Sequence, residues 1–303
     1  TDSVSIILQP GCYEIGCEVK VGVRRGWTYR LLKVYPQWQT DPVVVRESLP
    51  GMGRALQYRA AQDPVTGEAV YFSYDFLVPA ASAWIPKGGG EFELLTLPTD
   101  ETGVYYMGEP VIVDDAILVP YNINGAIQIA RLKNGVFEWI VADIAYGATG
   151  AVALVLDGDD HLWVLFNREV GGLINLYLRP LFDFQPDVTI AVDMGADQIF
   201  DVEWNATASA FDIGRAHSTG TYWKRYVPET AAFALAMISP ITAGWLDLEI
   251  NLETGRPALL YQHTSLQHFS ELNPDETTWS AEVIVDNSAN SSHQAQLVAA
   301  NGK

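Results

Sequence analysis

The sequence predicts an all-β protein, a six-bladed β-propeller whose blades are four-stranded antiparallel sheets. A pair of residues, aromatic then polar, recurs at steps of 45 to 50 residues: Tyr74-Asp75, Tyr121-Asn122, Phe166-Asn167, Phe211-Asp212 and Tyr261-Gln262. A second aromatic residue follows most of these pairs after 18 residues: Phe92, Trp139, Phe184 and Trp279. The 303 residues, 49% of them hydrophobic, also divide into six units of about fifty. Two linked markers at such a period indicate one repeated supersecondary unit.

The N-terminal unit, residues 17–48, is the least regular copy. It offers three strands, at Glu18–Val23, Trp27–Val34 and Pro42–Val45, and lacks the aromatic–polar pair. Near the other end of the chain, His293–Ala299 is typical of a first strand. We therefore expect 293–299 to complete this blade and close the ring, which removes open sheet edges. The alternative is that Val4–Gln9 is the first strand and the chain comes from a longer array.

Four middle units each read as four strands joined by polar turns. Their first turns are rich in Asp and Gly, the residues that favour tight turns. Examples are Asp63-Pro-Val-Thr-Gly67 and the two-residue hairpin Asp114-Asp115. The expected blades are 55–97, 109–142, 151–192 and 199–238.

The last unit, 246–286, shows the pattern most clearly. Trp245–Asn251 alternates apolar and polar residues, as a half-buried strand does. Pro257–Tyr261 is a continuous apolar run, which is typical of a strand covered on both faces. Leu266–Leu272 and Trp279–Asp286 follow as the third and fourth strands.

The last unit resembles the BNR-like propeller repeats of bacterial and phage proteins in the run DLEINLETGRPALLYQHTSLQHFSELNPDETTWSAEVIVD. The shared features are a turn with Gly, an apolar strand ending in Tyr and a polar residue, a Leu-x-aromatic strand, and a final Trp and Val-Asp. The resemblance covers about five units and implies a fold, with no particular activity. The Asp-box motif of sialidases is absent from the sequence, and so is the Trp-Asp ending of another propeller family.

The negative charge of the chain limits the kinds of partner that it is expected to bind. Its net charge is −19 and only 18 residues are Lys or Arg, so the basic surface that nucleic acid or anionic lipid requires is not expected. No apolar stretch reaches the length of a bilayer span, so membrane insertion is not expected either. Solubility, divalent cations and cationic partners remain compatible with this charge.

The two cysteines, Cys12 and Cys17, do not form a zinc or redox motif. A local disulfide across a turn and two unbonded thiols are both compatible with their spacing.

Equivalent positions in a ring face the same way, so the polar members of the pairs are expected on one face with the loops beside them. Aromatic rings near Asn, Asp, Arg and His suit a hydroxylated ligand such as a glycan. The candidate ligand-binding face comprises Asp75, Tyr106, Asn122, Asn124, Asn167, Arg168, Asp212, Arg215, His217, Trp245, Gln262 and His263. The alternative is a purely structural role, in which the aromatic residues pack between blades and the polar residues cap strand ends.

Metal and catalytic motifs are weak. Asp157, Asp159 and Asp160 resemble the start of a calcium loop, but its ligand spacing and closing Glu are missing, so a turn is the competing interpretation. No other cofactor is expected. The five histidines contain no HExxH pattern, and no GxSxG motif occurs.

The leading hypothesis for function is a non-catalytic binding or structural propeller that takes a glycan or protein partner. It would belong to a secreted, cell-surface or phage-tail assembly. The alternative is a carbohydrate-active enzyme, a glycoside hydrolase or lyase, with its site at the mouth of the central channel. Two carboxyl groups close together near that mouth would favour the enzyme.

Overall fold

The computed structural model describes residues 11–21, 24–34, 58–75, 80–88, 91–99, 104–141, 147–181, 186–193, 199–251, 253–263, 266–275 and 277–286. The chain divides into two compact units, Thr1–Gly53 and Arg54–Lys303. All regular elements in the described ranges are β-strands, which confirms the predicted all-β class. None of the described residues forms a helix of the length and apolar character that crossing a bilayer requires.

The described residues of the first unit form one long antiparallel hairpin. Strand β1 (Gly11–Val21) pairs with β2 (Arg24–Val34) over its whole length, so that Gly11 lies opposite Val34. The predicted strand at Trp27–Val34 falls within β2. The expected strands Pro42–Val45, Val4–Gln9 and His293–Ala299 lie outside the described residues.

Strand β1 also decides between the two alternatives for the cysteines. Cys12 and Cys17 both lie inside this continuous strand, opposite Lys33 and Thr28. A strand advances about 3.3 Å per residue, so their Cα atoms are roughly 16 Å apart. A disulfide needs Cα atoms within about 7 Å. The possible local disulfide is therefore wrong for this fold, because a strand replaces the turn that it required.

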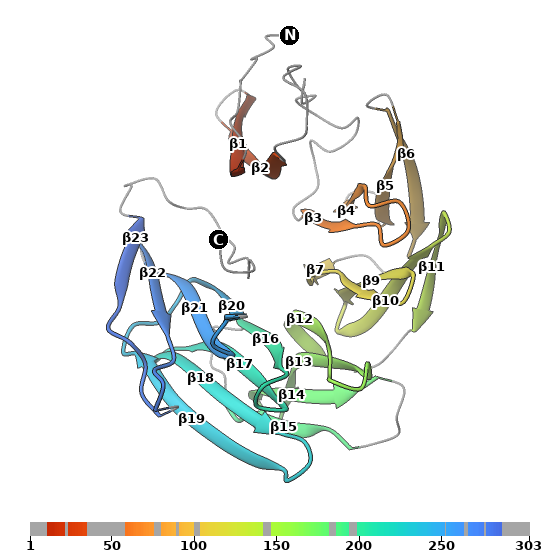
Figure 1. Cartoon of the computed structure of the whole chain (residues 1–303). Helices are drawn as coiled ribbons and strands as arrows, with labels where there is room; N and C mark the ends of the chain where they lie inside the picture. Colours follow the sequence, from red (N-terminus) through yellow and green to blue (C-terminus); the bar gives the residue numbers. More distant parts are fainter. Residues whose placement is uncertain are drawn as a thin grey trace. The chain divides into compact units, whose positions relative to one another are not determined.

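The described residues of the second unit form five antiparallel sheets, each built from strands consecutive in the chain (Figure 1). The strands of the first sheet are β3 (Tyr58–Gln62), β4 (Ala69–Asp75), β5 (Ala80–Gly88) and β6 (Glu91–Pro98). Those of the second are β7 (Val104–Met107), β8 (Val111–Val113), β9 (Ala116–Ile123), β10 (Ala126–Lys133) and β11 (Val136–Val141). Those of the third are β12 (Ala148–Leu156), β13 (Leu162–Val170), β14 (Leu173–Pro180) and β15 (Val188–Ala191).

The last two sheets are the most completely described. The strands of the fourth sheet are β16 (Phe200–Asn205), β17 (Ala210–His217), β18 (Gly220–Val227) and β19 (Ala232–Ser239). Those of the fifth are β20 (Trp245–Asn251), β21 (Arg256–His263), β22 (Leu266–Glu271) and β23 (Val283–Asp286). The prediction of four-stranded antiparallel sheets is confirmed for four of the five. Trp279, predicted to begin the last strand, instead forms an isolated bridge with Leu272 ahead of β23.

The second sheet differs from its predicted form because two segments share the edge of β9. Strand β7 pairs with the end of β9, and β8 pairs with its beginning. Gly108 joins these segments where a Cβ atom would lie 2.2 Å from the carbonyl oxygen of Val152 in β12. The second sheet therefore begins at Val104. The sequence predicts Tyr106 in a loop between blades, whereas the structure places it in β7, opposite Asn122.

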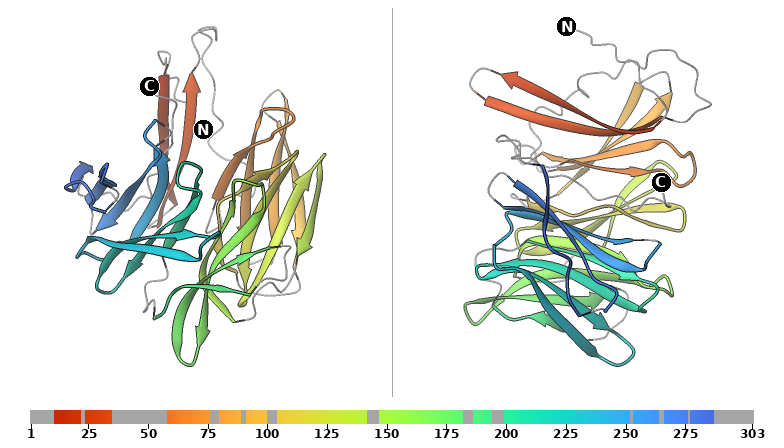
Figure 2. Two further views of the ribbon diagram at one scale, coloured as in Figure 1. Left: turned by 60° about the horizontal axis from the view of Figure 1, so that its bottom comes forward. Right: turned by 60° about the vertical axis from the view of Figure 1, so that its left-hand side comes forward.

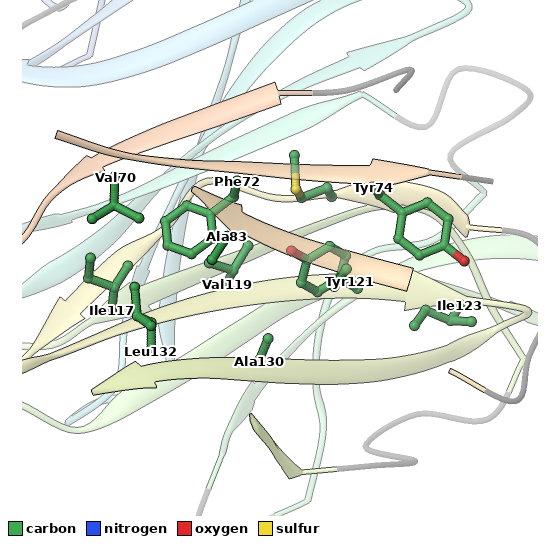
Figure 3. Packing of buried hydrophobic residues seen from close by; sticks show 12 residues of the cluster. Val70, Phe72, Tyr74, Ala83, Ile117, Val119, Tyr121, Ile123, Ala130 and Leu132 are labelled. Carbon is green, nitrogen blue, oxygen red and sulfur yellow. The ribbon is translucent and has the colours of Figure 1, made fainter. Parts of the chain in front are cut away.

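Apolar side chains hold successive sheets face to face. One cluster joins β4 to β9 through Phe72, Tyr74, Val119 and Tyr121, which Figure 3 shows between the two sheets. Three more clusters join the second sheet to the third, the third to the fourth, and the fourth to the fifth. Figure 2 shows the sheets following one another in chain order by colour. Because the second, third and fourth sheets pack against a neighbour on both faces, a second strand such as β9 is a continuous apolar run.

The first strands of the sheets lie next to one another. Strand β12 contacts β7, β9 and β16, and β16 contacts β20. In Figure 1 these first strands lie toward the middle of the view, and the last strands β6, β11, β15, β19 and β23 lie at its periphery. The first strands therefore lie on the inner side of the unit.

The first hairpin of most sheets is closed by an Asp or Asn side chain. Asp63 accepts from the backbone N–H groups of Val65 and Thr66, both at 2.8 Å. Asp157, Asn205 and Asn251 accept equivalent bonds at the ends of β12, β16 and β20. Such side chains hydrogen-bond to the backbone two or three residues on and fix the turn. These turns join the first and second strands of each sheet. The connections between second and third strands, such as the one between β4 and β5, lie at the opposite end of the sheets.

Candidate functional site

Four of the five polar marker residues lie at corresponding ends of second strands. Asp75 is the last residue of β4, Asn122 and Gln262 are the second last of β9 and β21, and Asn167 lies in the last half of β13. Only the backbone of Asp75 is described. These four residues therefore share one end of the sheets, as the repeat predicts.

Asp212 departs from this pattern. It is the third residue of β17, close to the opposite end of the sheets. Its side chain is fully buried and accepts from Arg225 Nε at 2.8 Å, Arg225 Nη2 at 3.0 Å and Trp223 Nε1 at 2.8 Å. The expectation that Asp212 belongs to the ligand-binding face is wrong, because the dipeptide Phe211-Asp212 occupies a different register in its strand.

Asn122 connects two sheets. It is fully buried, donates from Nδ2 to the carbonyl oxygen of Gly150 in β12 at 2.9 Å, and accepts from Gly125 N at 3.2 Å. The ring of Tyr121 lies 5.6 Å from that of Trp139, edge to face. The marker pair is therefore a packing and capping unit here. Its neighbour Asn124 is exposed, with a φ of 49° in the β9–β10 turn.

The two candidate residues in β13, Asn167 and Arg168, also make contacts within the protein. Asn167 is fully buried. Arg168 Nη2 forms an ion pair with Asp187 Oδ2 at 2.9 Å, and its guanidinium lies 4.4 Å from the centre of the Tyr177 ring.

Arg215 and His217 lie in a half-buried polar cluster at the end of β17. His217 Nδ1 is 2.7 Å from Thr219 Oγ1, and Thr219 Oγ1 is 2.7 Å from the hydroxyl of Tyr222 in β18. The Arg215 guanidinium lies 4.9 Å from the centre of the Tyr222 ring, and burial lowers the pKa of Arg215 from its usual value. Thr219 is exposed and the other three residues are half-buried. We name these four residues the β17–β18 cluster.

Three more candidates lie in the fifth sheet at the same end. Trp245 begins β20 opposite Gln262, and His263 ends β21. All three side chains are half-buried. The connection that leads to Trp245 is tied to the β17–β18 cluster, because Thr242 Oγ1 donates to the carbonyl oxygen of His217 at 2.7 Å. The structure thus brings Arg215, His217, Trp245, Gln262 and His263 to one end of two neighbouring sheets.

The candidate calcium loop is a strand-connecting turn. Asp157 Oδ1 accepts from the N–H groups of Asp159 and His161, both at 2.9 Å, and Oδ2 accepts from Trp163 Nε1 at 2.8 Å. These bonds engage both carboxylate oxygens of Asp157 in holding the turn. The described part of the chain also contains no cluster of three or more His, Cys, Asp or Glu residues arranged to hold a metal ion.

Four carboxyl groups on the inner side of the unit were missed by the sequence analysis. Asp201 and Glu203 lie in β16, and Asp247 and Glu249 lie in β20; all four are half-buried. Asp201 accepts from Leu248 N at 2.8 Å and from Val202 N at 2.9 Å. We name these residues the acidic quartet.

Burial and mutual repulsion raise the pKa values of three members of the acidic quartet. Burial, with the nearby charge of Glu109, raises the pKa of Asp201 to about 6. Burial, with the charge of Asp201, raises the pKa of Glu249 to about 7. Burial also raises the pKa of Glu203 well above its usual value, and Asp201, Glu249 and Asp247 add to that shift. Asp201, Glu203 and Glu249 therefore bind protons at a higher pH than ordinary carboxyl groups do.

No protein-family model matches the chain, and no curated protein sequence matches it. Among solved structures, it is similar to an ancestral GH74 enzyme, with a TM-score of 0.51 and 11% identity over 73% of this chain and 34% of that one. It is also similar to the Aleuria aurantia lectin in complex with Fucα1-6GlcNAc, with a TM-score of 0.52 and 7% identity over 77% of this chain and 79% of that one. The Dos1 propeller gives a TM-score of 0.49 and 11% identity.

The similarities to the GH74 enzyme and to the lectin, both with TM-scores above 0.5, show a propeller-type fold, which agrees with the predicted class of fold. The chain spans only about a third of the GH74 enzyme that it matches. At such low identities the likeness concerns the fold alone.

Proposed function

We propose that this protein is a non-catalytic binding propeller that recognises a glycan through the β17–β18 cluster. The observation that supports this is the arrangement of the half-buried Tyr222 ring with Arg215, His217 and Thr219 around it. An aromatic ring packs against the apolar face of a sugar, and neighbouring polar groups bind its hydroxyl groups. The contacts within the cluster hold these groups in position before a ligand arrives, which reduces the entropy lost on binding.

Trp245 and Gln262 extend this surface onto the fifth sheet. They lie opposite each other in the β20–β21 pairing, and the Thr242 contact with His217 joins their connection to the cluster. A glycan of more than one sugar would reach both sheets. The carbohydrate-related proteins among the structural neighbours are compatible with this proposal.

Binding is tested with the full-length protein on a glycan array, followed by calorimetric titration of the strongest hit. His217→Ala and Tyr222→Ala are each expected to weaken binding by about tenfold or more, because each removes a group in contact with ligand. His161→Ala is the matched control, since it replaces an exposed histidine in the β12–β13 turn. Melting temperatures of all variants distinguish lost binding from lost folding. An array without hits, or equal losses in the control, contradicts the proposal.

The acidic quartet favours a second candidate, a carbohydrate-active enzyme. Glycoside hydrolysis uses two carboxyl groups, one protonated to act as an acid and one ionised. Asp201 and Glu203 are half-buried neighbours on β16, and both have raised pKa values. A panel of fluorogenic aryl glycosides tests this candidate. Asp201→Asn and Glu203→Gln are each expected to reduce turnover by about 100-fold or more. No turnover above the buffer rate rules the enzyme out.

The six-bladed, closed ring also belongs to this proposal, with a sixth blade formed by residues 17–48 and 293–299. The five described sheets of the second unit and the strands β1 and β2 support it, as does the resemblance of residues 246–286 to BNR-like repeats. Removal of residues 293–303 should lower the melting temperature, whereas removal of residues 301–303 should not. Equal melting temperatures for both truncations would contradict closure by this strand.

A further inference from the structure

The outer strands of the five sheets differ in how they discourage pairing with another chain. Sheet edges are normally blunted by charged residues, by proline or by short length. Strand β6 carries Glu91, Glu93 and Pro98, and β11 carries Glu138. Strands β15 and β23 contain only four residues each.

Strand β19 has none of these protections. It is eight residues long, Ala232–Ser239, and contains neither a charged residue nor a proline. It pairs with β18 on one side and is the last strand of its sheet among the residues that the structure describes. Figure 1 shows it at the periphery of the unit. Its outer backbone groups therefore offer a row of donors and acceptors for strand pairing.

The side chains of β19 are exposed and apolar. Phe233, Leu235 and Met237 are 46%, 59% and 56% exposed. Since they alternate along the strand, they lie on the same face of the sheet. The ammonium group of Lys224, in the neighbouring strand β18, lies 4.0 Å from the centre of the Phe233 ring at one end of this row.

The size and charge of this surface argue against a second copy of the chain as its occupant. Three large apolar side chains exposed by about half present roughly 300 Å². A stable dimer buries about 800 Å² on each partner. Each copy also carries a net charge of −19, which opposes self-association.

We propose that β19 is an interaction edge that accepts one extended, apolar segment of another protein as a fifth strand of the fourth sheet. Main-chain hydrogen bonds give such strand addition its affinity, and side chains on alternate positions give its specificity. The apolar row favours Val, Ile or Leu on the facing positions of the partner. The acidic surface of this chain favours basic residues at the ends of the partner segment and disfavours acidic ones.

The probe is a fluorescein-labelled peptide of alternating valine and threonine with a lysine at each end, titrated by fluorescence anisotropy with the full-length protein. We expect saturable binding to the wild type. Leu235→Lys should weaken it by about tenfold or more, because a charge on an edge strand discourages pairing. The matched control is Leu94→Lys on β6, where Leu94 is 47% exposed, and it should change binding by less than about twofold.

A second peptide, with proline in place of its central valine and of the threonine next to it, distinguishes strand pairing from simple apolar contact. It should not bind: successive residues of a strand point their N–H groups to opposite sides, so one of the two prolines removes a donor to β19 in either register. Three results would overturn the proposal: no saturable binding of the first peptide, equal binding by Leu235→Lys, or equal binding of the proline peptide. Sedimentation equilibrium of the protein alone gives the remaining outcome. A dimer that Leu235→Lys dissociates would make a second copy the occupant and overturn the proposed partner.

Discussion

Replacing Asp212 with alanine is expected to lower the free energy of unfolding by about 3–5 kcal/mol. Asp212 is fully buried, and its oxygens accept four bonds, two from Arg225, one from Trp223 and one from Asn205 at 2.8 Å. Removing the carboxylate leaves the buried guanidinium of Arg225 without its countercharge, which is far more unfavourable than losing an exposed pair.

Two comparisons isolate this effect in urea unfolding experiments. Glu138→Ala breaks the half-exposed ion pair with Arg131 on β10 and should lower the free energy by less than about 1 kcal/mol. The double variant Asp212→Leu with Arg225→Met removes both charges and should recover part of the stability lost in Asp212→Ala. If Asp212→Ala and Glu138→Ala have equal effects, the buried pair does not stabilise the fold.

The sequence predicts the fold well where alternation and turns agree. Trp245–Asn251 is predicted as a strand by its alternating apolar residues, and β20 has the same bounds. The turn residues after it include Gly255, whose φ is +66° and whose missing side chain leaves room for Thr207 of the fourth sheet. Local propensity and packing thus favour the same structure in this part of the chain.

The error at Asp212 has a physical cause. Spacing between marker pairs counts residues along the chain, whereas the position in a sheet depends on the strand pairing that begins at the first turn. Phe211 lies opposite Trp204, next to the turn, while Tyr261 lies opposite Leu246, far from it. The Asn and Asp residues that close the first turns, such as Asn205 and Asn251, would have located the turn and corrected the register.

The acidic quartet was missed because its members carry no catalytic or metal motif. Its only signal is a repeated acidic pair with one residue between, Asp201 and Glu203, then Asp247 and Glu249 one period later. In a strand, such spacing places both side chains on the same face. Which strands line the inner side of the unit follows from packing between sheets, and a single sequence does not contain that information.

Raising the pH from 5 to 8 is expected to destabilise the protein because of the acidic quartet. The pKa of Asp201 is raised to about 6 and that of Glu249 to about 7, both mainly by burial. The folded state therefore binds more protons than the unfolded state between about pH 4 and these values. The stabilising contribution is fully present below the unfolded pKa and is lost as the pH rises through the folded pKa.

The size of this loss of stability follows from the same difference in proton binding between the folded and unfolded states. One group of this kind contributes about 3 kcal/mol, and coupled groups contribute less than their sum. Carboxyl groups with lowered pKa values, such as Asp157, Glu282 and Asp275, act in the opposite sense, but below about pH 4.5. The melting temperature should therefore fall by on the order of 5–10 °C between pH 5 and pH 8.

Neutral variants assign this pH dependence to the quartet. Glu203→Gln and Glu249→Gln should each raise the melting temperature at pH 8 and flatten its fall, because an amide has no ionised form to bury. Glu253→Gln, which replaces an exposed side chain in the β20–β21 turn, is the control and should leave the profile unchanged. Scanning calorimetry between pH 5 and pH 8 measures all three. A stability that is constant or rises over this range would mean that Asp201, Glu203 and Glu249 are ionised in the folded state, with their repulsion relieved by solvent or by a bound cation.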